Sequence, residues 1–303
     1  MKTNTILKNG GGELANQLWN YISIHAYSLE IGATTSNPSF FEYHYYFRFL
    51  KNESLIIRFL SLFFKKPRRR NHIINKIFRF KYKVLAEFIA RLNSNKIVSS
   101  INSTNKVTFL PPTVEYERKN KDIYFLGWLF RNPIGLEKYR QDLIDTFKPI
   151  QSIENKINNI VSNLKNKYKT IIGLHIRQGD YKTFKKGKYF IEQKRIVEIC
   201  NEYISNNNLD KNLTLFLVTS DGQIDTNLFA SLNIHISKEN AVTDLFLLSS
   251  TNIIIGSDSS FGHFASWYGN IPHIVIKNEM IDWEYYKGKT KYFINKYLEL
   301  LPL

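Results

Sequence analysis

The sequence predicts an α/β fold with a parallel sheet in the C-terminal half of the chain. From residue 153 onward, segments with helical spacing of apolar residues alternate with short apolar strands. Strands such as LTLFLV and NIIIG are apolar on both faces, which is typical of a parallel sheet covered by helices on each side. The sequence contains no repeat at the periods of solenoid proteins, so an array of stacked repeats is excluded.

The first elements are a strand, a tight turn and a helix. TNTILK at 3–8 is extended, NGGGE at 9–13 is a glycine-rich turn, and apolar residues recur at helical spacing from Leu14 to Leu29. A short glycine-rich loop before a helix lets backbone N–H groups approach an anion. A plain β–α turn has the same pattern, so both interpretations stay open.

A basic and aromatic helical insertion follows at about 40–110. Within it, residues 54–83 combine runs of Lys and Arg with Phe, Ile and Leu, and Pro67 separates two predicted helices. Three interpretations fit this segment: helices lying on an acidic membrane surface, an insertion whose basic side is only solvated, or a nucleic-acid contact. Because the chain has no recognised nucleic-acid-binding module, we expect no nucleic-acid partner.

The remaining elements alternate regularly along the chain. We expect a strand at 120–130, a helix from Pro133 and a hinge at 148–152, which divides the chain into domains at 1–150 and 151–303. In the second domain we expect helices at 153–167, 189–206, 243–249 and 259–269, and strands at 170–176, 213–219, 233–236, 252–256 and 273–276.

Composition limits the class of protein. Of the 303 residues, 43% are hydrophobic, which is typical of a folded globular protein. The chain has 42 Lys and Arg against 26 Asp and Glu, and the resulting formal charge of +16 favours an anionic partner. Cys200 is the single cysteine, which excludes an internal disulfide framework. The first residues lack the apolar core of a signal peptide, so we expect a cytoplasmic protein.

The stretch LHIRQGDY places polar side chains at the end of a predicted strand. His175 and Arg177 are two residues apart, so they point the same way on an extended chain, and Asp180 follows the turn. The guanidinium of an arginine can bind two phosphate oxygens at once and keeps its charge. An Arg–Asp ion pair beside a buried histidine would give the same pattern, so both interpretations stay open.

Two further strands end in polar residues. Ser220 and Asp221 follow one strand, where an Asp is also a common turn former or helix cap. Ser257–Ser260 precede a helix, where hydroxyls and N–H groups can bind an anion, although Ser is also a common N-cap. Asp244 begins another helix, as a partner of the helix dipole or as a contact to guanine. Because ligands of parallel α/β domains bind at the carboxyl ends of the strands, we expect these groups to converge.

The absence of other motifs narrows the kind of site. The sequence contains no Walker lysine motif, no G-x-G-x-x-G, no G-x-S-x-G, no H-E-x-x-H and no Asp-x-Asp pair. Arg, His, Asp and Ser side chains at one sheet edge therefore predict a nucleotide-sugar diphosphate site that needs no metal ion.

Four blocks of the sequence resemble the alpha-1,2-fucosyltransferase family and, more remotely, the GT-B fucosyltransferase superfamily. They are GGELANQLWNYISIHAYSLE, IYFLGWLFRNPIGLEKYRQDLIDTFKP, GLHIRQGDY and DLFLLSSTNIIIGSDSSFGHFASWYG, in the order that the family has them. The resemblance covers residues 5–30 and most of 120–278, and does not extend to the insertion.

The resemblance implies two Rossmann-like domains of the GT-B fold that face a central cleft. The domain at 1–150 would bind the acceptor, and the domain at 151–303 would bind GDP and send its last helix back to the first. The implied reaction moves fucose from GDP-fucose to a sugar hydroxyl, galactose in an alpha-1,2 linkage, with inversion and without a metal or other cofactor. The acceptor would be a surface glycan or a lipid-linked precursor at the cytoplasmic face of the inner membrane. The alternatives are a transferase for another nucleotide sugar and a basic protein that binds RNA or acidic lipid.

The resemblance also implies roles for single residues. Arg177 would neutralise the donor β-phosphate, His175 would lie beside the nucleotide and Asp244 would contact guanine. The other expected donor-binding residues are Ser220, Asp221, Ser259, Ser260, Asn16 and Gln17. A general base would remove the acceptor proton, with Asp180, Glu13 and His25 as candidates. Gln178, in place of the second arginine of the family signature, and Ala15, in place of a glycine, depart from the family pattern.

Overall fold

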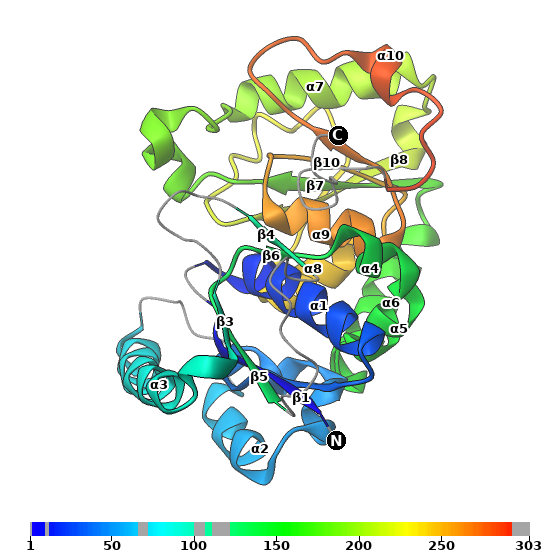
Figure 1. Ribbon diagram of the computed structural model, residues 1–303. Helices are drawn as coiled ribbons and strands as arrows, with labels where there is room; N and C mark the ends of the chain where they lie inside the picture. Colours follow the sequence, from blue (N-terminus) through cyan, green and yellow to red (C-terminus); the bar gives the residue numbers. More distant parts are fainter. Residues whose placement is uncertain (1, 10–11, 66–71, 100–106, 111–121, 293–303) are drawn as a thin grey trace. The chain divides into compact units, whose positions relative to one another are not determined.

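The computed structural model of the chain divides into two compact units (Figure 1). It describes residues 2–9, 12–65, 72–99, 107–110 and 122–292, without the side chains of residues 180, 184 and 185. Unit 1 reaches Gln151 and unit 2 begins at Ser152, one residue beyond the boundary expected from the sequence. The expected return of the last helix falls on 293–303, outside the described residues.

Unit 1 is built on a parallel sheet with the strand order β2-β1-β5-β3. These strands are β1 (Thr3–Lys8), β2 (Thr34–Ser36), β3 (Ile97–Ser99) and β5 (Asp122–Leu126). The helix α1 (Leu14–Glu30) buries 13 of its 17 residues. A helix buried on nearly all sides must be covered by further elements besides the sheet.

The elements that cover α1 come from the end of unit 1. They are α4 (Pro133–Lys138), α5 (Arg140–Thr146) and β6 (Phe130–Arg131), which pairs with β4 (Thr108–Phe109). The single helix expected from Pro133 is interrupted at Tyr139, whose φ of −106° and ψ of 20° are not helical. Proline begins α4, and the Asn132 side chain accepts the backbone N–H of Gly135 at 2.9 Å.

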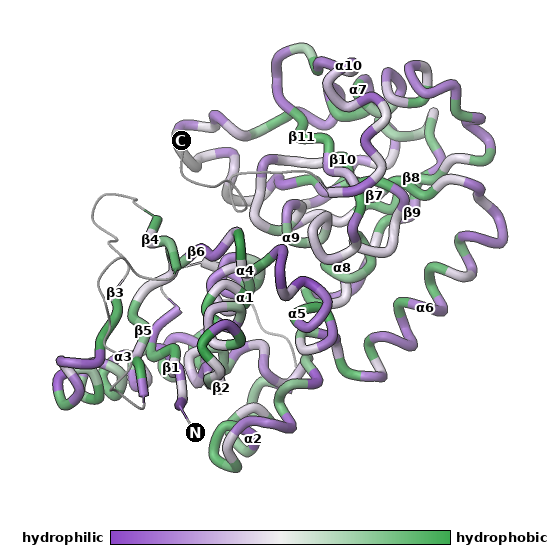
Figure 2. Tube along the Cα trace, turned by 45° about the vertical axis from the view of Figure 1, so that its right-hand side comes forward, coloured by the Kyte–Doolittle hydropathy of each residue, from purple (hydrophilic) through white to green (hydrophobic). Residues whose placement is uncertain are grey.

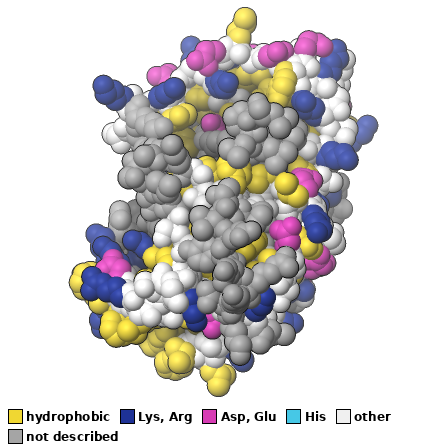
Figure 3. Space-filling view, viewed as in Figure 1, with side chains coloured by type: hydrophobic (Ala, Val, Ile, Leu, Met, Phe, Trp, Pro, Cys, Tyr) yellow, Lys and Arg dark blue, Asp and Glu magenta, His cyan; other side chains and the backbone are white. Residues whose placement is uncertain are grey.

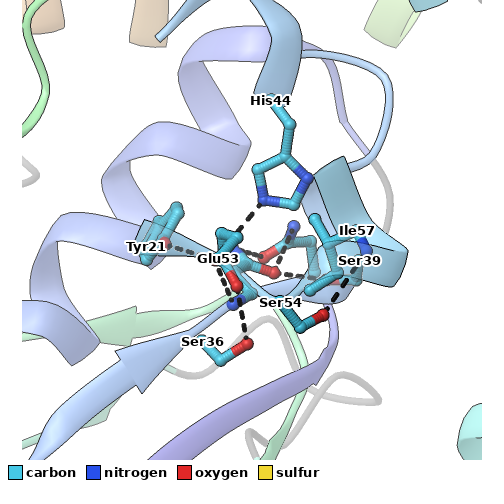
Figure 4. Close-up of polar contacts among 9 residues, drawn as sticks. Tyr21, Ser36, Ser39, His44, Glu53, Ser54 and Ile57 are labelled. Atoms are coloured by element: carbon cyan, nitrogen blue, oxygen red, sulfur yellow. Dashed lines mark hydrogen bonds and ion pairs between the residues drawn. The ribbon is translucent and has the colours of Figure 1, made fainter. Parts of the chain in front are cut away.

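The segment between β2 and α2 is held by a buried carboxylate. It contains three short 3₁₀ helices, η1 (Pro38–Phe40), η2 (His44–Tyr46) and η3 (Arg48–Asn52). Glu53 accepts hydrogen bonds from Tyr21 Oη at 3.3 Å and Ser36 Oγ at 2.9 Å, and His44 Nε2 lies 3.7 Å from it (Figure 4). Burial raises the pKa of Glu53 and lowers the pKa of His44 to about 3. These contacts tie the segment to α1 and β2.

The insertion contains the two helices expected from the sequence. They are α2 (Leu55–Ser61), continued by η4 (Leu62–Phe64), and α3 (Ile73–Leu92), which is followed by η5 (Ser94–Lys96). Pro67, expected between them, lies outside the described residues. Rings join the two helices to each other and to Phe41, because the centroid of Phe64 lies 5.1 Å from that of Phe41 and 5.2 Å from that of Phe78. Within the described residues, no helix is long and apolar enough to cross a bilayer.

Unit 2 contains a five-stranded parallel sheet with the order β11-β10-β7-β8-β9. The strands are β7 (Thr170–Ile176), β8 (Thr214–Ser220), β9 (Ile234–Ile236), β10 (Ile253–Gly256) and β11 (His273–Val275). The helices are α6 (Gln151–Lys165), α7 (Gln193–Asn206), α8 (Ala241–Leu248), α9 (Ser260–Gly269) and α10 (Trp283–Tyr286), with 3₁₀ turns η6 (Asp180–Lys182), η7 (Phe184–Gly187) and η8 (Lys211–Leu213).

Helices cover both faces of this sheet (Figure 1). Ile172, Leu174 and Ile176 of β7 share a core with residues of α7, whereas α8 and α9 pack against β7, β8, β10 and β11. The central strands are hydrophobic along their length (Figure 2), as expected for strands buried on both faces. Each strand and helix expected in the second half is present, although the helix expected at 189–206 begins only at Gln193.

Candidate functional site

The candidate site lies at the carboxyl ends of β7 and β10. The chain runs from β7 outward to β8 and β9, and then returns to place β10 on the other side of β7. The strand order therefore reverses between β7 and β10. In open parallel sheets this reversal leaves a crevice beyond the strand ends, where ligands bind.

A glycine allows the two strand ends to approach closely. A Cβ on Gly256 would lie 2.8 Å from the carbonyl oxygen of His175 and 2.9 Å from its Cβ. Beyond this contact, Ser257 N donates to the carbonyl oxygen of His175 at 3.1 Å, and the N–H of Arg177 donates to Ser257 Oγ at 3.3 Å. Ser257, the residue that follows β10, thus fixes the backbone from His175 to Arg177.

The side chain of Arg177 is held from two sides and remains partly accessible. Its Nε lies 3.0 Å from Asp221 Oδ2, and its guanidinium carbon lies 4.9 Å from the ring centroid of Tyr181. The side chains of Arg177 and Asp221 are 21% and 33% exposed. A guanidinium that is partly accessible at a sheet edge can approach a phosphate.

Asp221 also organises the turn after β7. Its Oδ1 accepts the backbone N–H of Gln178 at 2.7 Å and that of Gly179 at 3.0 Å. The buried side chain of Gln178 donates to the carbonyl oxygen of Ile191 at 3.0 Å. Asp221 is therefore a turn former and an arginine partner at once. The side chain of Gln178, which stands where the family signature has an arginine, therefore makes its hydrogen bond within unit 2.

His175 is buried and neutral. Its Nδ1 lies 3.1 Å from Thr219 Oγ1, and its ring stacks on Phe261 with centroids 4.8 Å apart. Burial, followed by the positive charge of Arg177 as a smaller cause, lowers the pKa of His175 to about 3. Its Nε2 is buried without a hydrogen-bond partner among the described residues. Such a ring can exchange one hydrogen bond with a ligand but cannot supply a positive charge to a phosphate.

The start of α9 follows β10 directly. Ser259 is its N-cap and accepts the N–H of Gly262 at 3.3 Å, and Ser260 is its first residue. The hydroxyl of Ser259 thus binds the helix itself, so the groups left for an anion are the N–H groups of the first turn.

A chain of side chains that sequence reasoning missed lies beside this helix. Asp258 Oδ1 lies 3.0 Å from His263 Nε2, and His263 Nδ1 lies 3.3 Å from His273 Nδ1. Tyr181 Oη donates to the carbonyl oxygen of Asp258 at 3.2 Å and so connects the turn after β7 with the loop before α9. Tyr181 stands only four residues after Arg177 in the sequence. This closeness along the chain was the one feature of the sequence that could have indicated their contact. Among the described residues, no group of three or more His, Cys, Asp and Glu could hold a metal ion.

The other two predicted donor residues of this sheet edge lie at the end of β8 and in the first turn of α8. Ser220, the last residue of β8, accepts the N–H of Gly222 at 3.1 Å. Asp244, in the first turn of α8, accepts a hydrogen bond of 2.5 Å from Ser237, which follows β9. Burial is the largest cause that raises the pKa of Asp244 to about 7, and Glu239 adds to it. The pKa of this carboxyl group therefore lies much closer to neutral pH than that of an exposed aspartate.

Asp180 belongs to η6, directly after the turn at Gly179, but its side chain lies outside the described part of the structure. Of the other two candidate bases, Glu13 is exposed at the N-cap of α1. His25 packs on Phe147 and bonds Thr35 Oγ1 at 2.9 Å, and burial lowers its pKa to about 4. His25 is thus occupied within unit 1.

Unit 1 contains a pocket of about 220 Å³ at the carboxyl end of β1. Gln17 lines it, together with Asn9, Phe41, Tyr82 and other residues of β1, η1 and α3. Asn16, the other residue expected in this region, is not part of the lining and instead crowds Gly12, whose φ is +116°. Arg79, also in the lining, is paired with Glu42 at 2.6 Å. Aromatic faces beside amide and charged groups are suited to a polar ligand with apolar faces.

Comparison with known proteins gives matches that extend over both units of the chain. The family model described as glycosyl transferase family 11 matches residues 112–297, more than half of the sequence. A search of curated proteins with the sequence finds no match.

Solved structures of fucosyltransferases share the fold at low identity. A mutant of Arabidopsis thaliana FUT1 in complex with GDP is 11% identical, with 92% of this chain and 71% of that chain covered and a TM-score of 0.51. POFUT1 in complex with GDP-fucose is 13% identical, with 88% and 93% covered and a TM-score of 0.51. NodZ alpha-1,6-fucosyltransferase soaked with GDP-fucose is 13% identical, with 88% and 93% covered and a TM-score of 0.50. The expected GT-B-like α/β fold is confirmed, and the family match shows that the chain belongs to glycosyl transferase family 11, a fucosyltransferase family.

Proposed function

We propose that this protein transfers fucose from GDP-fucose to a hydroxyl of an acceptor sugar, galactose in an alpha-1,2 linkage, with inversion at the anomeric carbon. The observation that carries this proposal is Arg177, held by Asp221 and Tyr181 where β7 and β10 end. Membership of the family supports the reaction class, and GDP or GDP-fucose in the related structures supports the donor.

The proposed chemistry needs charge stabilisation at the leaving diphosphate. As the acceptor oxygen bonds to the anomeric carbon, the bond to the β-phosphate oxygen breaks and GDP carries away the electron pair. Arg177 and the N–H groups at the start of α9 would stabilise the negative charge that grows on that oxygen. We propose no metal ion and no other cofactor for this step. The acceptor proton would pass to a general base, for which Asp180 is the candidate nearest in sequence to Arg177.

The nucleotide would be recognised along the same sheet edge. Asp244 would accept two N–H groups of guanine, and the neutral ring of His175 would lie beside the nucleotide. Ser220 and Asp221 stand at the end of β8, and Ser259 and Ser260 stand at the start of α9, which follows β10; all four would complete the donor site. Two N–H donors on guanine match the two oxygens of one carboxylate, which supports GDP over nucleotides without this pair of donors.

The acceptor would bind in unit 1. The pocket that Gln17 lines has aromatic rings beside polar groups, which is the usual composition of a sugar site. We propose a surface glycan or a lipid-linked precursor as the acceptor, modified on the cytoplasmic face of the inner membrane.

A different nucleotide sugar is the second candidate donor. Gln178 stands where the family signature has its second arginine, and its side chain is buried against Ile191. The donor site therefore lacks one positive charge of the family pattern, and this favours testing other donors beside GDP-fucose.

Calorimetric titration with GDP, followed by a transfer assay with several nucleotide sugars, tests the proposal. We expect GDP to bind and GDP-fucose to be the active donor. Arg177→Ala should lower turnover about 10²–10³-fold, as expected when one charge-stabilising donor is lost. Arg195→Ala is the matched control, because it removes only ion pairs with Glu198 and Glu202 on α7. Transfer from another nucleotide sugar alone would support the second candidate, and absence of GDP binding would refute GDP-fucose as the donor.

A further inference from the structure

The outer side of the insertion carries most of the exposed apolar surface of the described chain. Of eighteen large hydrophobic side chains exposed among the described residues, twelve lie within residues 55–92. We call these twelve side chains the α2–α3 face: Leu55, Ile56, Phe59, Leu62, Phe63, Ile73, Ile77, Phe80, Val84, Leu85, Phe88 and Leu92. Leu55 is 77% exposed and Phe80 69%. Contiguous apolar surface of this kind marks an interaction site.

The apolar residues form stripes on folded helices. In α3 the exposed residues Ile73, Ile77, Phe80, Val84 and Phe88 recur every three or four positions, which places them on one side. Asn75 and Ala86 of the same helix are buried on the inner side. The spacing is that of an amphipathic helix whose exposed apolar side lies opposite Asn75 and Ala86, with Phe80 at its edge, where it also lines the pocket of unit 1.

The two helices present one continuous surface. The ring centroid of Phe63 lies 6.1 Å from that of Phe78 in α3 and 5.8 Å from that of Phe59 in α2. Figure 3 shows hydrophobic side chains over α3 and α2, at the lower left and the bottom of the view, with Lys and Arg among them. The α2–α3 face is thus a single patch with basic groups at its border.

The charge of the segment is almost entirely positive. Residues 54–92 contain eleven Lys and Arg and one acidic residue, Glu87, which gives a net charge of +10. In the described part, Lys76, Lys81 and Lys83 alternate with the apolar stripe of α3. A second copy of the chain on this face would bring +10 against +10, so charge repulsion opposes self-association.

We propose that the α2–α3 face docks the protein on an acidic lipid bilayer. Amphipathic helices with Phe and Leu on one side and Lys and Arg at its edges lie in the membrane interface, where the apolar side chains enter the acyl boundary. The basic side chains meet anionic headgroups there. Both components are present on this face, and no other group of exposed residues in the described chain combines them.

Vesicle co-sedimentation of the full chain, without nucleotide, tests the proposal independently of the transferase reaction. The vesicles contain either phosphatidylcholine alone or phosphatidylcholine with phosphatidylglycerol. We expect binding to the phosphatidylglycerol vesicles, weak binding to the neutral ones, and loss of binding as NaCl rises from about 0.05 to about 0.5 M. The triple variant Ile77→Ser, Val84→Ser, Phe88→Ser should bind at least about tenfold more weakly.

Matched controls separate docking from unfolding. The variant Ile134→Ser, Leu228→Ser, Met280→Ser changes three exposed apolar residues outside the face, and it should bind vesicles like the parent chain. Circular dichroism and thermal melting should be unchanged in both variants, because all six side chains are exposed. The proposal is overturned if the parent chain stays in the supernatant with acidic vesicles or if both triple variants lose binding equally. Concentration-dependent dimers that only the face variant abolishes, without vesicle binding, would identify a self-association surface instead.

Discussion

Arg177 owes its position to a carboxylate on the neighbouring strand end. Asp221 uses one oxygen for the arginine and the other for two backbone N–H groups of the turn. The guanidinium is therefore oriented before any ligand arrives, and preorganised donors of this kind stabilise a developing charge most effectively. Asp221 is in this sense a positioning residue.

Two substitutions of Asp221 separate its two contacts. Asp221→Asn keeps an oxygen for the turn but removes the ion pair with Arg177, so we expect turnover to fall about tenfold at nearly unchanged thermal stability. Asp221→Ala also leaves two N–H groups without their acceptor, which should cost a further ~1–3 kcal/mol of unfolding free energy. Steady-state kinetics and thermal melting measure the two effects. Equal stability of both variants would show that the turn does not depend on this carboxylate.

Asp244 predicts a pH dependence of nucleotide binding. Its pKa is raised to about 7, mainly by burial, so the carboxylate that would accept two guanine N–H groups is protonated as the pH falls below 7. We expect GDP affinity to fall by up to about tenfold per pH unit below that value. Asp244→Asn should bind GDP weakly and without this pH dependence. Calorimetric titrations at pH 8, 7 and 6 measure it, and a flat affinity in the parent chain would rule out this role.

At the scale of elements, the contact between β7 and β10 leaves no room for a side chain at position 256. A Cβ at position 256 would press against backbone and Cβ atoms of His175, which cannot rotate away. Gly256→Ala should therefore reduce the unfolding free energy by about 1–3 kcal/mol and weaken GDP binding, because β10 carries Ser257 toward Arg177.

Gly32→Ala provides the comparison for that prediction. Gly32 has open space around its Cβ position but a φ of +64°, so alanine there should cost about 1 kcal/mol through backbone strain alone. Since Gly32 belongs to unit 1, GDP affinity should stay as in the parent chain. Urea unfolding and GDP titration of both variants measure the difference; equal GDP affinity in both would contradict the role given to Gly256.

The long elements were predictable because their side-chain pattern repeats. The long strands of unit 2 are mostly apolar and its helices have a clear period, so their order and approximate limits follow from the sequence. The short strands β2, β3 and β4 were not predicted. β2 consists of Thr34, Thr35 and Ser36, which carry no apolar pattern, and its place is set by pairing with β1.

The candidate site was predictable to a similar degree. Strand ends indicate which residues share a sheet edge, and this placed His175, Arg177 and Asp221 together. The stacking of His175 on Phe261 and the chain from Asp258 to His273 depend on how α9 packs. Those contacts arise from tertiary packing and leave no periodic signal in the sequence.

At the scale of the molecule, buried neutral histidines predict sensitivity to acid. Burial lowers the pKa of His44 and His175 to about 3 and that of His25 to about 4. Below pH 6.5 the unfolded chain takes up protons at these positions while the folded chain does not. These histidines therefore reduce the unfolding free energy as the pH falls from about 6.5 toward 4.

His44 offers a direct measurement of that effect. Its ring is buried against Phe40 and Phe49, so His44→Phe keeps the packing and removes the titrating group. At pH 5 the variant should retain about 2 kcal/mol more of its neutral-pH stability than the parent chain does. Urea unfolding at pH 7.5 and pH 5 measures the two differences. An identical loss in both proteins would mean that His44 is protonated in the folded state.

The strand pairings of the two larger sheets have a consequence for synthesis. Every pairing in them is parallel. Parallel neighbours are joined by a crossover connection, so the first strand of each pair is synthesised well before its partner. The first strand, β1, lies beside β5, and residues 9–121 leave the ribosome between them. Folds with such distant partners assemble slowly. The apolar helices of the insertion thus emerge before the sheet that supports them can close, and a nearby surface that shelters them would shorten their exposure to aggregation.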